Sequence, residues 1–117
     1  MNMYILIALL ILVESGGDPN AVGDRGLAVG VLQIHPCVVA DVNRFCKTNY
    51  TLNDRLDPVL SRKMGSAYLW YWGNQYEKET GLPPTPKVMA SIWHLGPRGW
   101  RDPRAAAYWQ KVKSKMT

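Results

Sequence analysis

An apolar run close to the start of the chain predicts the first helix. Every residue of Tyr4–Val13 (YILIALLILV) is hydrophobic, and Glu14 with Ser15-Gly16-Gly17 follows at once. The run is too short to span a bilayer, and apolar runs of about 10–14 residues are more often helices buried in a core. The pattern therefore predicts that the Glu14 carboxyl group lies at the end of a core helix.

Further helices are predicted where apolar residues recur at helical spacing after a proline. Four such stretches follow the pairs His35-Pro36, Asp57-Pro58, Thr85-Pro86 and Asp102-Pro103. In the last three pairs an N-cap residue precedes proline at the first helical position. The helix after Pro58 is expected to end before Gly81, and Thr51 with Asp54 adds a weaker capping-box pattern.

No stretch alternates apolar and polar residues for more than a few positions, so we expect a mainly α fold with at most a small β element near Gly23–Gly30. A length of 117 residues suits a single domain, residues 1–117, with its own core. A hydrophobic content of 47% excludes a disordered chain.

The charge of the chain is positive and uneven. The net charge is +5, and from Gly96 onward six basic residues accompany one acidic residue, Asp102. Such a surface favours polyanions such as nucleic acid, acidic lipid or an anionic cell wall, and a solvated basic helix face is an equally good explanation. No nucleic-acid-binding motif is recognised, so no nucleic-acid partner is expected.

The two cysteines, Cys37 and Cys46, are predicted to be free thiols. If both lie on one helix, their Cα atoms are roughly 13 Å apart, whereas a disulfide requires less than about 7 Å. Free thiols are typical of synthesis in a reducing compartment. With no His or Cys cluster nearby, the pair does not indicate a metal site.

No targeting segment is recognised at the N-terminus. No basic residue precedes the apolar run, and no small-residue cleavage site follows it. We therefore expect synthesis in the cytoplasm and export by another route, such as host-cell lysis or a leader that has been lost.

Glu14 is the first candidate for chemistry. A carboxyl group on an apolar helix is poorly solvated, which raises its pKa, and the negative end of the helix acts in the same direction. A carboxyl group that stays protonated near neutral pH serves as a general acid. The alternative is that Glu14 is only the first solvated residue after a core helix.

The segment after Glu14 has the composition of a tight loop beside a cleft. Glycines recur in ESGGDPNAVGDRGLAVGVLQI (residues 14–34), where they imply sharp turns and close backbone approach. Polar residues, including Asn20, Asp24 and Gln33, lie between them. Such a loop would return Gln33 to the side of Glu14.

This segment resembles the lysozyme-like family that contains the soluble lytic transglycosylase domains and the goose-type lysozymes. The motifs E-S-G-G, N-A, G-D-x-G, A-x-G and Q-I occur in that family's order and spacing. Residues 90–97 (ASIWHLGP) resemble its aromatic-Asn-x-Gly segment, with Trp93 at the aromatic position and His94 at the Asn position. Ala67-Tyr68-Leu69 and Tyr108-Trp109 resemble later helical motifs, so the resemblance covers nearly the whole chain.

The resemblance implies a peptidoglycan-degrading glycosidase. Glu14 would protonate the oxygen leaving from the β-1,4 bond between N-acetylmuramic acid and N-acetylglucosamine. A lysozyme-type muramidase then adds water, whereas a lytic transglycosylase closes a 1,6-anhydro ring with the sugar's own 6-hydroxyl. We lean slightly to the muramidase, because G-D-x-G is the more goose-like feature.

Asp24 is the second expected catalytic residue. It matches the Asp of the G-D-x-G segment, which implies a role in positioning the water, and the alternative is an Asx-turn that caps the glycine loop. His35 stands where some goose-type enzymes have a further Asp, which weakens the hypothesis of two catalytic carboxylates.

The expected glycan contacts come from both segments. Gln33 would offer its amide to an N-acetyl group or to Glu14. His94 would bind a substrate carbonyl, or alternatively cap the end of its helix. Aromatic side chains bury the C–H surfaces of sugars. The predicted substrate-binding residues are Ser15, Gln33, His35, Tyr68, Trp93, His94 and Tyr108.

We therefore expect a lysozyme-like domain that acts as a monomer on peptidoglycan glycan strands and needs no metal or cofactor. The compact domain suits a phage-type lysis or virion protein. The rival function within this class is lytic transglycosylation. The rival from another class is a catalytically inactive peptidoglycan-binding module, and the intact Glu14 argues against it.

Overall fold

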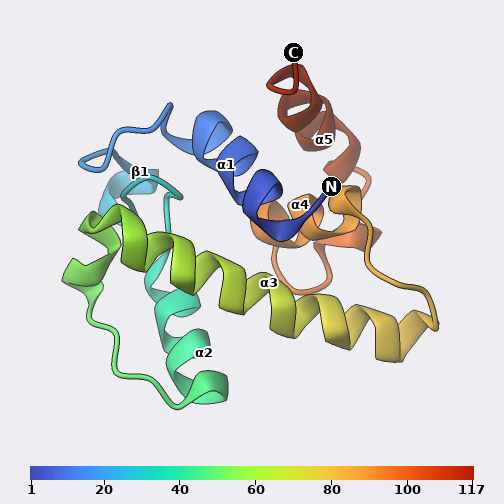
Figure 1. The fold of residues 1–117 in the computed structure, drawn as a ribbon, viewed down its shortest axis with the longest axis horizontal. Coiled ribbons are helices and arrows are strands. Elements are labelled where there is room, and N and C mark those ends of the chain that lie inside the picture. The colour runs from blue at the N-terminus through green and yellow to red at the C-terminus, as the bar shows by residue number, and fades with distance from the viewer.

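The long helix α3 (Pro58–Thr80) crosses the molecule, and the other elements pack around it (Figure 1). The computed structural model describes residues 1–117. The other helices are α1 (Met3–Glu14), α2 (Pro36–Cys46), α4 (Pro86–Leu95) and α5 (Ala105–Ser114). Shorter elements are the strands β1 (Val22–Gly23) and β2 (Ala28–Val29) and the 3-10 turns η1 (Asp24–Gly26), η2 (Leu52–Leu56) and η3 (Gly99–Arg101). The predicted mainly α fold with a small β element is confirmed.

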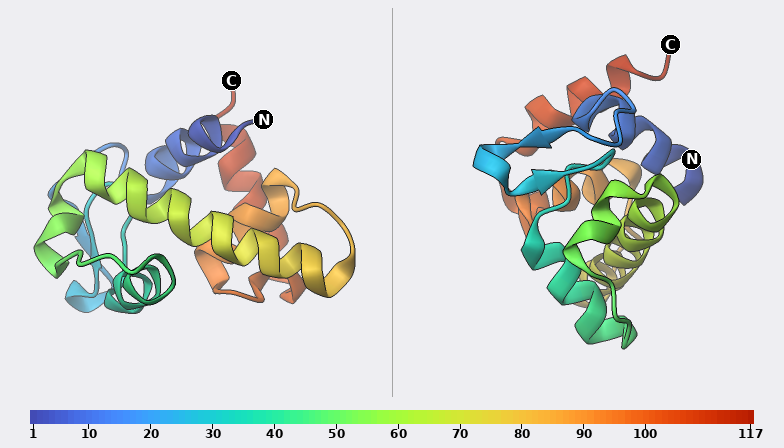
Figure 2. Two further views of the ribbon diagram at one scale, coloured as in Figure 1. Left: turned by 60° about the horizontal axis from the view of Figure 1, so that its bottom comes forward. Right: turned by 90° about the vertical axis from the view of Figure 1, so that its left-hand side faces the viewer.

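The helices form two groups, α2 with α3 and α1 with α4 and α5, which are joined by contacts of α3 with α1 and α4. α2 packs mainly against α3, while α1 and α4 contact α3, each other and α5. The antiparallel strands β1 and β2 pair Val22 with Val29 and Gly23 with Ala28. Figure 2 shows this hairpin lying beyond the end of α1, on the path of the chain to α2. The hairpin is therefore placed beside Glu14, the last residue of α1.

Helix α1 supplies much of the core. Its buried residues are Leu6, Ile7, Leu9, Leu10 and Ile11. They belong to one apolar cluster with residues of every other helix and of the segment 31–34. Tyr4, Ile5 and Leu12 stay exposed, so one apolar edge of the helix faces outward. The predicted core helix is confirmed, and none of the helices has the length and hydrophobicity required to cross a membrane.

Two of the three predicted Asp-Pro or Thr-Pro helix starts are confirmed. The Asp57 side chain accepts hydrogen bonds from the Val59 and Leu60 amides, and Thr85 accepts one from Val88. The expected start at Pro103 is wrong by two residues, because α5 begins at Ala105.

Asp102 explains the later start of α5. Its carboxylate accepts a hydrogen bond from the Arg104 amide at 2.9 Å and pairs with the Arg104 guanidinium at 2.6 Å. The Ala105 amide also donates to the Asp102 carbonyl oxygen at 3.0 Å, so residues 102–105 form a turn and the regular helix begins only at Ala105.

Other predicted features of the helices are also present. Gly81 ends α3 in the left-handed conformation with φ of 76°. The Thr51 and Asp54 pair forms a capping box, at the start of η2. Helix α2 is continuous from Pro36 to Cys46, and both cysteines are free thiols, as predicted.

Candidate active site

The end of α1 is tied to the following loop through Ser15. Its hydroxyl donates to the carbonyl oxygen of Val31 at 2.7 Å and accepts from the Gly17 amide at 3.0 Å. Ser15 was expected to contact substrate, but it does not line the cavity beside Glu14. Its side chain instead fixes the turn in which Glu14 lies.

Glu14 is partly buried and bonded to a residue 94 positions away. The Tyr108 hydroxyl on α5 donates a hydrogen bond to Glu14 Oε2 at 2.5 Å. Burial raises the pKa of the Glu14 carboxyl above its ordinary value, and this is the largest effect on it. The Tyr108 hydrogen bond opposes the rise, the Asp24 charge adds to it, and His35 and Lys111 oppose it. The net effect favours the protonated acid.

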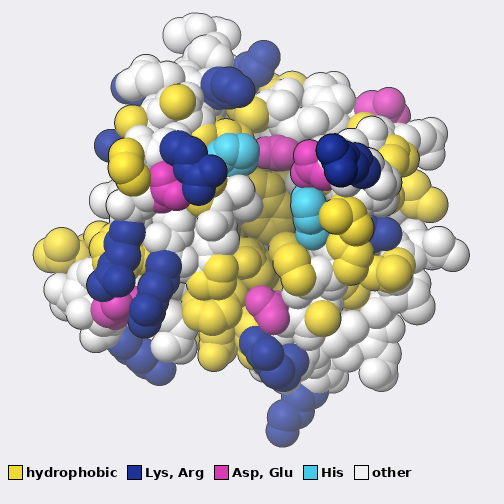
Figure 3. Space-filling view, turned by 180° about the vertical axis from the view of Figure 1, so that it is seen from behind, with side chains coloured by type: hydrophobic (Ala, Val, Ile, Leu, Met, Phe, Trp, Pro, Cys, Tyr) yellow, Lys and Arg dark blue, Asp and Glu magenta, His cyan; other side chains and the backbone are white.

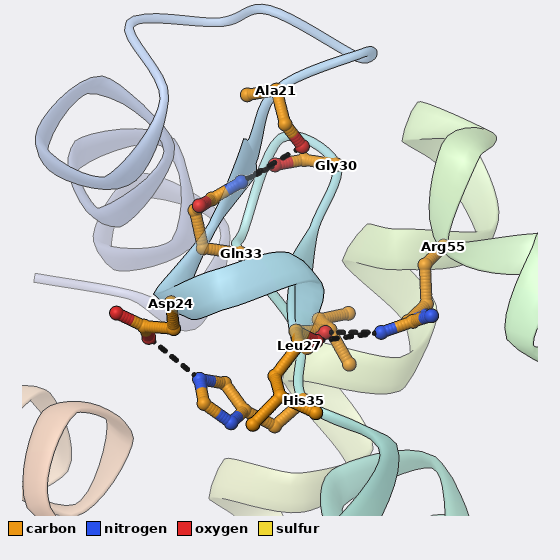
Figure 4. Close-up of polar contacts among 8 residues, drawn as sticks. Ala21, Asp24, Leu27, Gly30, Gln33, His35 and Arg55 are labelled. Carbon is orange, nitrogen blue, oxygen red and sulfur yellow. Dashed lines mark hydrogen bonds and ion pairs between the residues drawn. The ribbon is translucent and has the colours of Figure 1, made fainter.

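Asp24 and His35 form a pair on the hairpin side of the site. Asp24 Oδ2 lies 2.8 Å from His35 Nε2 (Figure 4). The Asp24 backbone is held in the left-handed region at φ of 48°. Its carboxylate makes no hydrogen bond to the backbone, so Asp24 does not form the alternative Asx turn. The Asp24 side chain is 68% exposed and therefore accessible to water.

Gln33 holds the loop together. Its Nε2 donates to the carbonyl oxygens of Ala21 and Gly30, both at 3.0 Å (Figure 4). A Cβ atom at Gly23 would lie 2.6 Å from Gln33 Oε1, so a larger residue there would displace the Gln33 side chain. The expected hydrogen bond from the Gln33 amide to Glu14 is therefore wrong, because both amide hydrogens are used within the loop.

The Arg55 side chain stabilises the hairpin through hydrogen bonds, and this residue was not singled out from the sequence. It is 8% exposed. Its guanidinium donates to the carbonyl oxygens of Leu52, Leu27 and Ile34 at 2.8–2.9 Å, and Figure 4 shows it reaching the loop from η2. Gly30, at φ of 86°, leaves no room for a Cβ atom beside the Arg55 carbonyl. No local sequence pattern indicates this role, because Arg55 lies 28 and 21 positions away from Leu27 and Ile34.

Glu14 and Asp24 line one cavity of about 430 Å³. Figure 3 shows the hollow, with histidine and acidic side chains near one end of an apolar floor. The other predicted site residues that line it are Gln33, His35, Tyr68, Trp93 and His94. No group of three or more His, Cys, Asp or Glu side chains is arranged to hold a metal ion.

Aromatic side chains form part of the cavity wall. Tyr68 on α3 and Trp93 on α4 meet edge to face, with ring centroids 5.7 Å apart. Tyr68 is almost fully buried, and burial raises the pKa of its hydroxyl. The accessible part of Trp93, with the small part of Tyr68 that reaches the cavity, gives apolar surface of the kind that packs against sugar rings.

His94 lies at the end of α4, where its ring stacks on Tyr108. The ring centroids are 4.1 Å apart and the planes differ by 3°. The helix end is closed by the Gly96 amide, which donates to the Ile92 carbonyl. The His94 side chain makes no hydrogen bond, so capping of α4 is not its role in this structure.

Comparison with known proteins adds one finding. The family model described as the transglycosylase SLT domain matches residues 1–110. No significant match to the chain was found among curated proteins or among solved structures. The matched range contains every residue of the cavity and the Tyr108 that bonds to Glu14.

Proposed function

The chain belongs to the transglycosylase SLT domain family, and we propose from this premise that Glu14 is its catalytic general acid. Membership makes the protein a lytic transglycosylase-type enzyme that acts on peptidoglycan. The proposed scissile bond is the β-1,4 bond between N-acetylmuramic acid and N-acetylglucosamine. The assignment of Glu14 as the general acid rests on the environment of its side chain.

Glycosidic cleavage requires a proton on the leaving oxygen, because an alkoxide is a poor leaving group. Glu14 is the cavity carboxyl whose pKa is raised by burial. It faces the same hollow as Tyr68 and Trp93, which are the proposed contacts for sugar rings. Gln33 and His35 are proposed to contact the glycan from the hairpin side.

We infer that water is the acceptor, which makes the reaction that of a muramidase. The supporting observation is the Asp24–His35 pair on the same cavity as Glu14. His35 fixes one oxygen of the Asp24 carboxylate, and the other oxygen is available to accept a proton from water. That water oxygen bonds to C1 of the muramic acid as the bond to the leaving sugar breaks.

Anhydro-ring formation is the second candidate. Two observations favour it: the family bears the name of transglycosylases, and Asp24 is far more exposed than Glu14. In this route the 6-hydroxyl of the muramic acid attacks C1, and its proton returns to Glu14. No second carboxylate is required.

Product masses distinguish the two candidates. Purified glycan strands are digested and the products are weighed by mass spectrometry. Hydrolysis gives reducing muramic ends, whereas anhydro products are about 18 Da lighter because no water enters. Under the muramidase proposal Asp24→Asn slows release of reducing ends strongly. Predominantly anhydro products from the wild type would overturn the muramidase assignment and leave Glu14 as the acid.

The remaining proposals concern the whole protein. We propose that residues 1–117 act as one domain and as a monomer, in a phage-type lysis or virion protein. Basic side chains surround the hollow in Figure 3, and the net charge of +5 favours contact with an anionic wall. Release of wall fragments separates this enzyme from an inactive binding module, which would bind walls without cleaving them.

A further inference from the structure

We propose that His94 is a positioning residue that acts on Glu14 through Tyr108. This inference rests on the proposed role of Glu14 and holds for either acceptor. The alternative role is the predicted one, in which His94 binds a substrate carbonyl from the cavity wall. The three side chains come from three helices, α4, α5 and α1, and form one continuous contact.

The contact is defined by two measured geometries. The His94 and Tyr108 rings are parallel, with centroids 4.1 Å apart. The Tyr108 hydroxyl then reaches Glu14 Oε2 at 2.5 Å. Tyr108 is 4% exposed, so its ring is enclosed by its neighbours, and His94 is the aromatic side chain stacked on its face. The stack therefore sets the plane of the ring that aims the hydroxyl.

The direction of that hydroxyl matters for acid catalysis. A donor on Oε2 fixes the carboxyl group and leaves Oε1 as the oxygen that carries the transferable proton. If the Tyr108 ring tilts, the carboxyl group is free to rotate and the proton is no longer aimed. A well-placed general acid contributes a factor of about 10²–10⁴ in rate. A modest loss of orientation of the Glu14 carboxyl group therefore lowers the rate measurably.

The charges around His94 favour its neutral form. Partial burial lowers the pKa of His94, and Lys111 on α5 and Arg104 before α5 lower it further. Asp24 on the hairpin opposes them, and Glu14 on α1 lies beyond the Tyr108 hydroxyl. A neutral ring orients Tyr108 without placing a positive charge near Glu14, which would favour the carboxylate over the acid.

Three substitutions separate positioning from substrate binding. His94→Ala removes the stacked ring, His94→Phe keeps a ring without polar atoms, and His94→Asn keeps polar atoms without a ring. Positioning predicts that His94→Ala lowers kcat by about tenfold with KM within about twofold. It also predicts that His94→Phe restores most of that loss and His94→Asn does not. Rescue by Asn but not Phe, or a rise in KM alone, would overturn the proposal.

A double substitution tests the path through Tyr108. In a Tyr108→Phe background, where no hydroxyl remains to be aimed, His94→Ala is expected to lower kcat by less than about twofold more. A full tenfold additional loss would show that His94 acts independently of Tyr108. Thermal melting of each variant checks that the fold is kept.

A measurement without turnover separates this inference from the proposed function. The Glu14 carboxyl is titrated by carbon-13 NMR in wild type, Tyr108→Phe, His94→Ala and His94→Phe. We expect His94→Ala to move the Glu14 pKa upward, as Tyr108→Phe does, and His94→Phe to leave it near the wild-type value. An unchanged titration in His94→Ala would refute the positioning role, whether or not the protein cleaves walls.

Discussion

At the scale of single residues, the account depends on two opposing effects on Glu14. Burial raises the pKa of its carboxyl, and the hydrogen bond from Tyr108 lowers it. The acid form is present below the folded-state pKa and is lost as the pH rises through it. The alkaline side of the activity profile therefore reports on Glu14.

Tyr108→Phe tests this balance. The change removes the hydroxyl and keeps the ring that stacks on His94. Because the lost hydrogen bond favoured the carboxylate, the pKa of Glu14 is expected to rise further. The alkaline limb of the pH–rate profile should move to higher pH with it. A limb that stays in place would show that the Tyr108 hydrogen bond does not tune Glu14.

The sequence predicted part of this residue-scale arrangement. Glu14, Asp24 and His35 were expected at one site, and they line one cavity. The bond from Tyr108 to Glu14 was not predicted, because no local pattern relates two residues 94 positions apart. Gln33 was expected to face Glu14, but two nearby carbonyl groups compete for its amide and bind it.

At the scale of elements, the hairpin that carries Asp24 depends on Arg55. Arg55→Met removes the donors to three loop and turn carbonyls while keeping a long apolar side chain. We expect the free energy of unfolding to fall by roughly 3 kcal/mol, since the carbonyl groups are left without partners. Arg62→Met on exposed α3 surface is the matched control and should change stability by less than about 0.5 kcal/mol. Equal urea midpoints for the two variants would contradict this role of Arg55.

The cysteines of α2 give a second test at this scale. Cys37 lines the cavity, whereas Cys46 lies at the other end of the helix, and both are exposed free thiols. A bulky maleimide on Cys37, in the Cys46→Ser variant, should slow wall cleavage by at least about tenfold by filling the cavity. The same reagent on Cys37→Ser should leave the rate nearly unchanged. Equal inhibition of both variants would place Cys37 outside the substrate path.

Helix ends were predictable where one side chain decides them. Asp57 and Thr85 cap their helices as the sequence indicates, while a turn from Asp102 to Ala105 delays the start of α5. For the two-residue strands of the hairpin, the sequence predicted only the region in which they lie. Their pairing depends on Arg55, Gln33 and the glycine conformations together, and a periodic pattern of apolar residues cannot predict such contacts.

At the scale of the whole molecule, the site is assembled where the two helix groups meet. α1 delivers Glu14, the hairpin delivers Asp24, and α4 and α5 deliver His94 and Tyr108. Helical periodicity predicted the fold class, whereas the common location of these residues followed from resemblance to a family rather than from spacing. Their relative geometry emerges only from packing of helices that are distant in sequence.

The measurement that tests the central claim most directly is release of soluble glycan fragments from purified bacterial walls by wild type and Glu14→Gln. The amide keeps the shape of the side chain but its N–H protons are too weakly acidic to be transferred to the leaving oxygen, so we predict that release falls by at least about 10²-fold. At neutral pH the variant should melt no lower than the wild type. Because the folded-state pKa of Glu14 lies above its unfolded-state value, the carboxyl reduces stability as the pH rises from the unfolded-state pKa through the folded-state pKa, and the amide avoids this penalty. Release by folded Glu14→Gln within tenfold of the wild type would show that Glu14 is not the acid.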